Sequence, residues 1–168
     1  MRRKQIVIGV ATLVASWYGM MAIHEAGHCL GAWLTGATVA GVTFPLLGFS
    51  RTDVSGGDHP LLVVWAGPVF GVLLPLVMLL CCRRFGGVGR DVVLFFAGFC
   101  LLVNGIYIGL GASAKVGDAL DLIRCGAPMW HLLAFGATAS LAGLCRWHGL
   151  GPFGDWFRPD PKQLGADG

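Results

Sequence analysis

Long apolar runs constrain the fold of this chain more than any other feature of its sequence. Each is long enough for an α-helix to cross a lipid bilayer, which takes roughly 17–25 residues. The runs occupy residues 6–34, 61–82, 92–110 and 128–145. Hydrophobic residues make up 55% of the chain and charged residues only 12%, which fits neither a disordered chain nor an ordinary soluble domain. The sequence therefore predicts an all-α integral membrane protein with about four transmembrane helices.

Basic residues near the ends of these runs predict how the chain is oriented. One side of a four-span arrangement would hold Arg2, Arg3, Lys4, Arg83, Arg84, Arg90 and Arg146. The other side would hold only Arg51, Lys115 and Arg124. Because cytoplasmic loops carry the excess of Lys and Arg, both termini are expected in the cytoplasm. The net charge of +3 is spread over the ends of the spans, which argues against a nucleic acid as a partner.

The segments between and after the runs are more polar. Residues 37–59 are rich in Gly, Thr, Asp and Ser and alternate between apolar and other residues over 38–44. This pattern favours a short β-like segment at the membrane surface, and an irregular loop is the alternative. Residues 147–168 carry few helix signals and are expected to form an irregular cytoplasmic tail. Residues 1–146 are therefore expected to form one polytopic membrane domain.

The motif His24-Glu25-Ala26-Gly27-His28 lies near the end of the first apolar run. On a helix, residues four apart share a face, so both imidazoles can bind one zinc ion while Glu25 acts as a general base beside it. Glu25 is the only glutamate in the chain, and ionisable side chains within apolar spans are costly and usually functional. The alternative is a pair of histidines satisfied by neighbouring backbone. The motif predicts a zinc site within the membrane.

A catalytic zinc ion needs a third protein ligand and an open position. His24 lies about 18 residues beyond the start of its run, or roughly 27 Å of helix, which places it toward the non-cytoplasmic side. The candidate ligands on that side are Asp118, Asp121, His59 and His131. Asp118 has a structural alternative, since it can serve as the N-cap of a short helix, with Asp121 satisfying the same backbone amides.

Three sequence elements, HEAGH at 24–28, AGP at 66–68 and GDA at 117–119, together resemble the site-2 protease family of intramembrane zinc metalloproteases. The resemblance covers residues 6–125. The site residues that it implies are the zinc ligands His24, His28 and Asp118 and the general base Glu25. The resemblance also implies a bacterial inner membrane as the location.

Asn104 lies within a strongly apolar run, where an amide must find a polar partner. One interpretation is catalytic, with Asn104 binding the substrate carbonyl or the developing oxyanion. The family's Asn-Pro run before the aspartate is represented here by Asn104 without a proline. The other interpretation is a hydrogen bond that joins two helices. The sequence leaves both open.

These features predict an intramembrane zinc endopeptidase that hydrolyses a peptide bond in or next to a transmembrane segment of a protein substrate. Its expected partners are the lipid bilayer, a membrane-protein substrate and a regulatory membrane protein. Two alternatives remain: a zinc-binding membrane transporter and a catalytically silent regulatory membrane protein. A transporter would be expected to carry further acidic residues or histidines along its spans, and a silent protein has no need to retain Glu25.

Overall fold

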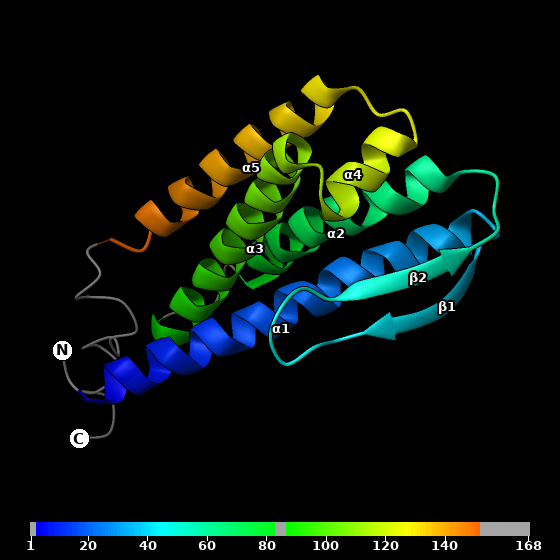
Figure 1. Ribbon diagram of the computed structural model, residues 1–168. Coiled ribbons are helices and arrows are strands. Elements are labelled where there is room, and N and C mark those ends of the chain that lie inside the picture. The colour runs from blue at the N-terminus through cyan, green and yellow to red at the C-terminus, as the bar shows by residue number, and fades with distance from the viewer. Residues whose placement is uncertain (1–2, 83–86, 152–168) are drawn as a thin grey trace, which may run out of the picture.

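The computed structural model describes residues 3–82 and 87–151, which are mostly helical (Figure 1). The elements in chain order are α1 (Arg3–Leu34), β1 (Thr38–Thr43), β2 (Arg51–Ser55), α2 (Pro60–Cys81), α3 (Gly87–Ala114), α4 (Gly117–Arg124) and α5 (Met129–His148). A mostly helical chain with a short β segment after the first helix is therefore confirmed. α4 adds a short helix to those expected from the apolar runs.

Three of the described helices, α1, α2 and α3, are long and apolar enough to cross a membrane. They support a multi-pass membrane protein. α5 has 20 residues, but Trp130, His131 and Arg146 near its ends lower its apolar character, and it is not among those three. A fourth crossing by α5 stays a prediction. α5 also extends to His148, so the predicted irregular tail begins later than expected, and its residues from 152 onward lie outside the described residues.

Helices α1 and α2 pack closely because glycines on α1 leave room for the backbone of α2. A Cβ on Gly27 would lie 2.4 Å from the carbonyl oxygen of Ala66, and one on Gly31 would lie 2.7 Å from the Cβ of Ala66. Small residues permit this close approach between helices in membranes. The contact flanks His28, so it brings α2 against the part of α1 that carries the motif.

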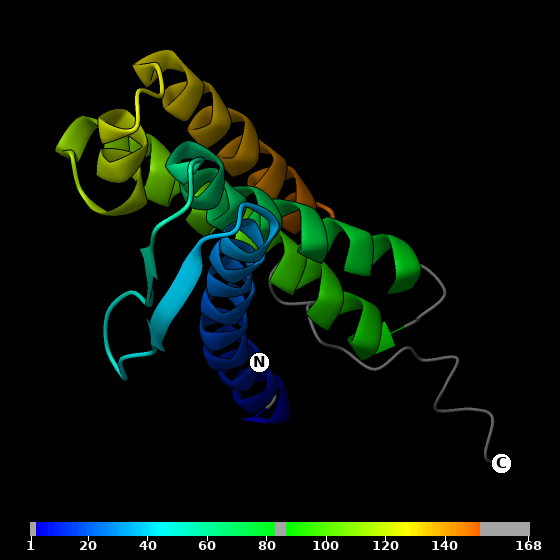
Figure 2. The same cartoon turned by 90° about the vertical axis from the view of Figure 1, so that its right-hand side faces the viewer.

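Helix α3 packs along α5, and glycines on both helices allow their backbones to approach. A Cβ on Gly136 would lie 2.6 Å from the Cα of Gly109. Near the C-terminal end of α5, the indole of Trp147 stacks on Phe95 and donates a hydrogen bond to its carbonyl oxygen over 3.0 Å. α3 also contacts α2, and it therefore connects the α1–α2 pair to α5 (Figure 2).

The two strands form an antiparallel hairpin beside the C-terminal half of α1 (Figures 1 and 2). Its register pairs Thr38 with Ser55 and Thr43 with Arg51. The loop between the strands reaches back along α1, where the Tyr18 hydroxyl donates to the carbonyl oxygen of Leu46 over 3.1 Å. The rings of Trp17 and Phe49 lie 5.6 Å apart, centroid to centroid. These contacts fix the hairpin against the helix that carries the HEAGH motif.

Helix α4 folds back onto α3 through a buried apolar cluster. Its members are Ile108, Ala112, Ala119, Leu122, Ala127 and Leu132. The turn before α4 requires positive φ angles of 55° at Lys115 and 56° at Gly117. A Cβ on Gly117 would also lie 2.2 Å from the hydroxyl oxygen of Tyr107, so glycine is required there on both counts. This turn sets the position of Asp118, the next residue.

Candidate metal centre

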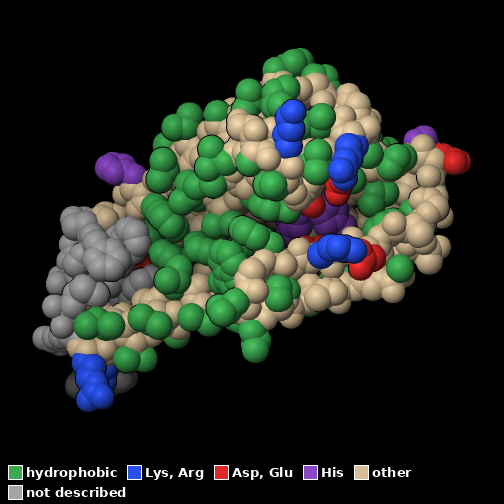
Figure 3. Space-filling model, viewed as in Figure 1, with side chains coloured by type: hydrophobic (Ala, Val, Ile, Leu, Met, Phe, Trp, Pro, Cys, Tyr) green, Lys and Arg blue, Asp and Glu red, His purple; other side chains and the backbone are tan. Residues whose placement is uncertain are grey.

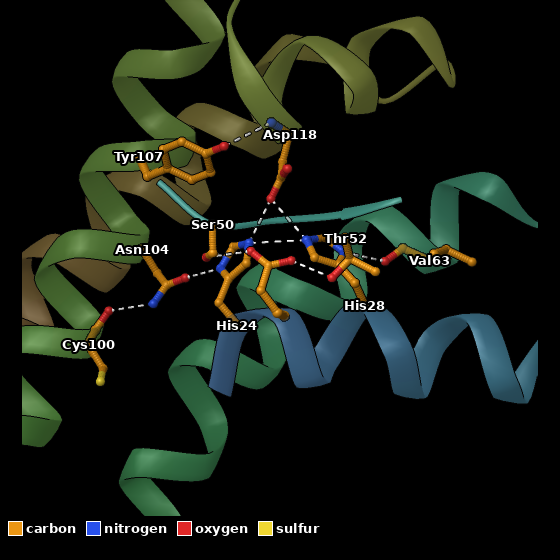
Figure 4. Close-up of polar contacts among 10 residues, drawn as sticks. His24, His28, Ser50, Thr52, Val63, Cys100, Asn104, Tyr107 and Asp118 are labelled. Atoms are coloured by element: carbon orange, nitrogen blue, oxygen red, sulfur yellow. Dashed lines mark hydrogen bonds and ion pairs between the residues drawn. The ribbon is translucent and has the colours of Figure 1, made fainter. Parts of the chain in front are cut away.

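Side chains from α1 and α4 converge on one point near the C-terminal end of α1 (Figure 4). The Nε2 atoms of His24 and His28 lie 2.7 and 3.1 Å from Oδ2 of Asp118. The two Nε2 atoms lie 3.1 Å from each other. His24 and His28 are buried, with 6% and 7% of their surfaces exposed. Together the three residues could hold a metal ion.

The donor atoms and their spacing fit zinc. Two imidazole nitrogens and one carboxylate oxygen form a set typical of catalytic zinc sites that keep a fourth position open. Metal–ligand distances of about 2.0–2.1 Å in a tetrahedral site place the ligand atoms roughly 3.3 Å apart. The observed separations of 2.7–3.1 Å are a few tenths of an ångström shorter, so small rotations of these side chains would admit the ion. Other divalent transition metals favour similar ligands.

Hydrogen bonds on the far side of each imidazole turn Nε2 toward this point. Nδ1 of His28 lies 2.9 Å from the carbonyl oxygen of Val63, which can only accept, so Nδ1 carries a proton. Nε2 therefore faces Asp118, to which it donates when the imidazole is protonated, and it can bind a metal ion in place of that proton. Nδ1 of His24 lies 2.7 Å from Oδ1 of Asn104. Partners of this kind hold a ligand histidine in its tautomer and orientation.

Asn104 occupies a position that links His24 to α3. Its Nδ2 donates to the carbonyl oxygen of Cys100 over 2.8 Å, one turn earlier on the same helix, while its Oδ1 faces His24. Asn104 has 1% of its surface exposed. These contacts explain how an amide is satisfied in an apolar helix, and they favour a role in orienting His24. A direct contact between Asn104 and substrate stays a prediction.

Asp118 lies in the first turn of α4, outside the candidate membrane spans. Its N-cap interpretation is wrong, because Val116 is the N-cap and no side chain caps the helix. The backbone N–H of Asp118 donates to the Tyr107 hydroxyl over 3.3 Å. Burial raises the pKa of Asp118, but hydrogen bonds with the two histidines outweigh it and hold the pKa well below its usual range. Asp118 is therefore a carboxylate at neutral pH, the form that binds a cation.

Glu25 is held by the hairpin. It has 3% of its surface exposed, and each carboxylate oxygen accepts a hydrogen bond from a hydroxyl group, one directly before β2 and one within it. The donors are Ser50 Oγ at 2.6 Å from Oε1 and Thr52 Oγ1 at 2.5 Å from Oε2. Hydrogen bonds to the charged form compensate a buried carboxylate for lost hydration. Ser50 and Thr52 are functional candidates that sequence reasoning missed, since nothing in the sequence links them to residue 25.

A cleft opens over these side chains between the hairpin and α4. Its lining includes Glu25, His28, Thr52, Asp118, Asp121 and Arg124. Figure 3 shows histidine side chains deep in a hollow on this face, with basic and acidic side chains around its mouth. Ion pairs border it on both sides, between Arg51 and Asp53 on β2 and between Arg124 and Asp121 on α4. The candidate site therefore opens to the surface between the hairpin and α4.

The other candidate ligands lie outside this group. Asp121 is paired with Arg124 at 3.3 Å. His131 is exposed at the start of α5, where its ring contacts Trp130. His59 is exposed and directly precedes α2. Within residues 3–82 and 87–151, the group of residues that could hold a metal comprises His24, His28 and Asp118.

Gly67 of the AGP element touches the metal centre, and this gives a first prediction. A Cβ on Gly67 would lie 2.3 Å from Nε2 of His28, a ring already fixed on its other side by Val63. Gly67→Ala should displace the imidazole and weaken zinc binding by at least ~10-fold, measured by competition with a chromogenic chelator. Gly89→Ala on α3 is the matched control, because its Cβ would meet no atom within 4 Å. Equal zinc affinity in the two variants would contradict this role for Gly67.

The position of Asn104 gives a second prediction. Asn104→Ala removes the acceptor at Nδ1 of His24, so the imidazole loses its fixed orientation. Zinc affinity should fall by roughly 10- to 100-fold, the usual effect of losing such a partner. Cys100→Ala, which truncates a buried side chain one turn away but keeps the carbonyl that accepts from Asn104, should bind zinc normally. An unchanged zinc affinity in Asn104→Ala would leave Asn104 as a link between helices only.

No protein-family profile, curated protein or solved structure matches this chain. The resemblance to the site-2 protease family therefore stays a prediction from the three sequence elements.

Proposed function

We propose that this protein is an intramembrane zinc endopeptidase that cuts a peptide bond in or next to a transmembrane segment of another membrane protein. The observation that supports it most is the shared cleft of Glu25, His28 and Asp118, with His24 completing the ligand set. A metal site alone would not need a carboxylate base on the same helical turn. When bound by the two histidines and Asp118, zinc supplies a Lewis acid that activates water and polarises a carbonyl.

In this mechanism Glu25 moves the proton. Its carboxylate accepts a proton from the attacking water and returns it to the amide nitrogen that leaves. Ser50 and Thr52 keep both carboxylate oxygens at the cleft, so the base does not have to be ordered again in each cycle. Met20, Met21 and Phe49 line a small, mostly apolar pocket on one side of Glu25, and such surroundings would limit the access of bulk water to the base.

The substrate must unwind before it can react, because every backbone polar group of a transmembrane helix is satisfied within the helix. Strand β2 offers a place for the unwound segment. It lines the cleft through Arg51, Thr52, Asp53 and Val54, and in a two-stranded sheet each strand has one unpaired edge. An extended peptide can pair with such an edge through backbone hydrogen bonds. We therefore propose that β2 holds the substrate beside the metal.

Replacing the hairpin tests this arrangement. A Gly-Ser linker in place of residues 38–55 should leave about one zinc per chain, because the three ligands lie on α1 and α4. Cleavage should fall by at least ~100-fold, since both substrate alignment and the hydroxyl contacts to Glu25 are lost. The measurement is zinc content beside cleavage of a transmembrane reporter. Val39→Thr with Val42→Thr in β1 is the control that keeps the strand, and intact cleavage in the linker variant would refute the role of β2.

The metal-ligating residues also favour hydrolysis over transport. A transporter would be expected to hold further ligands along its spans. Within the part of the chain that the structure describes, one group of three metal-capable residues is present, at one end of the bundle. The HEAGH glutamate is retained, which a silent regulatory protein would not need.

The proposed location is a bacterial inner membrane, with α5 as a fourth crossing. The start of α1 and the end of α5 lie at the same end of the bundle (Figure 1), as four crossings require. Lys4, Arg90 and Arg146 belong to that end, which would be cytoplasmic. The metal centre would then lie toward the opposite face, and a membrane-protein partner would regulate access to it.

The proposal is tested with purified protein in lipid vesicles and a panel of transmembrane reporter peptides, each with a helix-weakening residue at a different depth. Mass spectrometry should identify two fragments from a single bond in or next to the apolar segment. A chelator should stop the reaction, and zinc should restore it. Zinc-loaded protein that cuts none of the reporters would count against proteolysis.

A further inference from the structure

A second polar site lies at the end of the bundle opposite the metal centre. It is a pocket between the C-terminal end of α2, the first turn of α3 and the last turn of α5. The described residues that line it are Leu79, Cys82, Arg90, Val93, Leu94 and Arg146. None of them belongs to the metal centre or to the cleft beside it.

Two exposed arginines from different helices line the pocket. Arg90 comes from α3 and Arg146 from α5. Neither has an ion-pair partner among the residues that the structure describes. Like charges that share a pocket repel each other unless an anion lies near both. The first turn of α3 carries no acidic side chain, and Asp91 follows Arg90 directly in the next turn. The N-terminal end of a helix also favours an anion through its dipole.

The other walls of the pocket are apolar. Leu79 lies in the last turn of α2, and Val93 and Leu94 follow one turn after Arg90 on α3. With α2 and α3 as membrane spans, these side chains would lie at the depth of lipid acyl chains and Arg90 at the depth of the headgroups. Guanidinium groups bind phosphate oxygens in pairs, and basic pockets between transmembrane helices bind anionic headgroups.

We propose that this pocket binds an anionic phospholipid, with its phosphate between Arg90 and Arg146 and an acyl chain along Leu79 and Val93. The inference does not depend on proteolysis. It requires only that α2 and α3 span the membrane. The lipid would bridge α2 and α5, which make few direct contacts with each other although α3 packs against both.

The experiment is a thermal unfolding assay on the full chain in a non-ionic detergent, with added phosphatidylglycerol, phosphatidylcholine or inorganic phosphate. Phosphatidylglycerol should raise the Tm of the wild type by roughly 5 °C at a large excess over Kd. Phosphatidylcholine and inorganic phosphate should not. Arg90→Gln with Arg146→Gln should abolish the shift. The control is Arg3→Gln with Lys4→Gln, which removes two exposed charges from the same end of the bundle but outside the pocket.

A second variant keeps the test valid if Arg90→Gln with Arg146→Gln fails to fold. Val93→Trp fills the apolar wall and keeps both arginines, so it should also lose the phosphatidylglycerol shift. Zinc content reports on the fold of the opposite end in every variant. An equal shift in the pocket variant and the control would overturn the site in favour of general surface attraction. An equal shift with inorganic phosphate would overturn the lipid as its ligand, as would the absence of any shift in the wild type.

Discussion

Glu25→Gln should bind zinc as the wild type does and cleave at least ~1,000-fold more slowly. The amide has the size of the carboxylate and lies outside the ligand group, so the metal centre keeps its three donors. It cannot take a proton from water, and a positioned general base contributes about 10²- to 10⁴-fold. The measurement is kcat on a transmembrane reporter, with zinc per chain determined on the same preparation.

The loss of kcat must be specific to Glu25. Asp91→Asn makes the same carboxylate-to-amide change at the opposite end of the bundle, near the start of α3, and should leave kcat within ~3-fold of the wild type. Ser50→Ala removes one of the two hydroxyls that hold Glu25. Its kcat should lie between those of Glu25→Gln and Asp91→Asn. If Glu25→Gln retains the kcat of the wild type with zinc bound, Glu25 is not the base and the proposed mechanism is wrong.

The helical part of the fold could be predicted because it follows from local sequence. Apolar runs of bilayer length predicted α1 and α2 nearly at their observed bounds, but the run at 92–110 covers only the middle of α3, which extends over Gly87–Ala114. The boundaries of α5 were less clear, because Arg146 and Trp147 end the apolar run while the backbone continues as a helix to His148. The hairpin was one of two interpretations, since short alternating segments fit a strand and a loop equally well.

The candidate metal ligands were predictable in part for the same reason. The four-residue spacing of His24 and His28 is a local property of one helix. Asp118 lies 94 residues from His24, and no periodicity relates residues that far apart. It was selected by resemblance, and the fold supplies the physical account: the positive φ at Gly117 and the packing of α4 on α3 bring it to the histidines.

The residues that support the site could not be predicted. Ser50 and Thr52 reach Glu25 only because the hairpin folds back along α1. The carbonyl of Val63 meets His28 only because glycines let α2 approach α1. Gly67 was singled out as part of the AGP element, and the structure adds that its missing side chain leaves room for the His28 ring. Such roles depend on tertiary contacts, which a single sequence does not specify.

His24→Ala with His28→Ala should remove the metal completely. The wild type should contain about one zinc per chain after purification in detergent, and the double variant none. The variant leaves Asp118 as the remaining member of the group, and one carboxylate in a cleft cannot replace two imidazoles, since binding at such sites depends on the full set of ligands. Elemental analysis by mass spectrometry, with protein concentration from amino-acid analysis, gives the ratio directly.

His59→Ala with His131→Ala is the matched control, because it removes the same number of imidazoles from exposed positions outside the group. It should keep one zinc per chain. Zinc retained by His24→Ala/His28→Ala but lost from the control would move the metal site away from the HEAGH motif. A wild type that binds no metal would reduce the three side chains to a hydrogen-bonded cluster between α1 and α4. The Glu25 carboxylate would then have no metal to work beside, and the regulatory membrane protein would become the better interpretation.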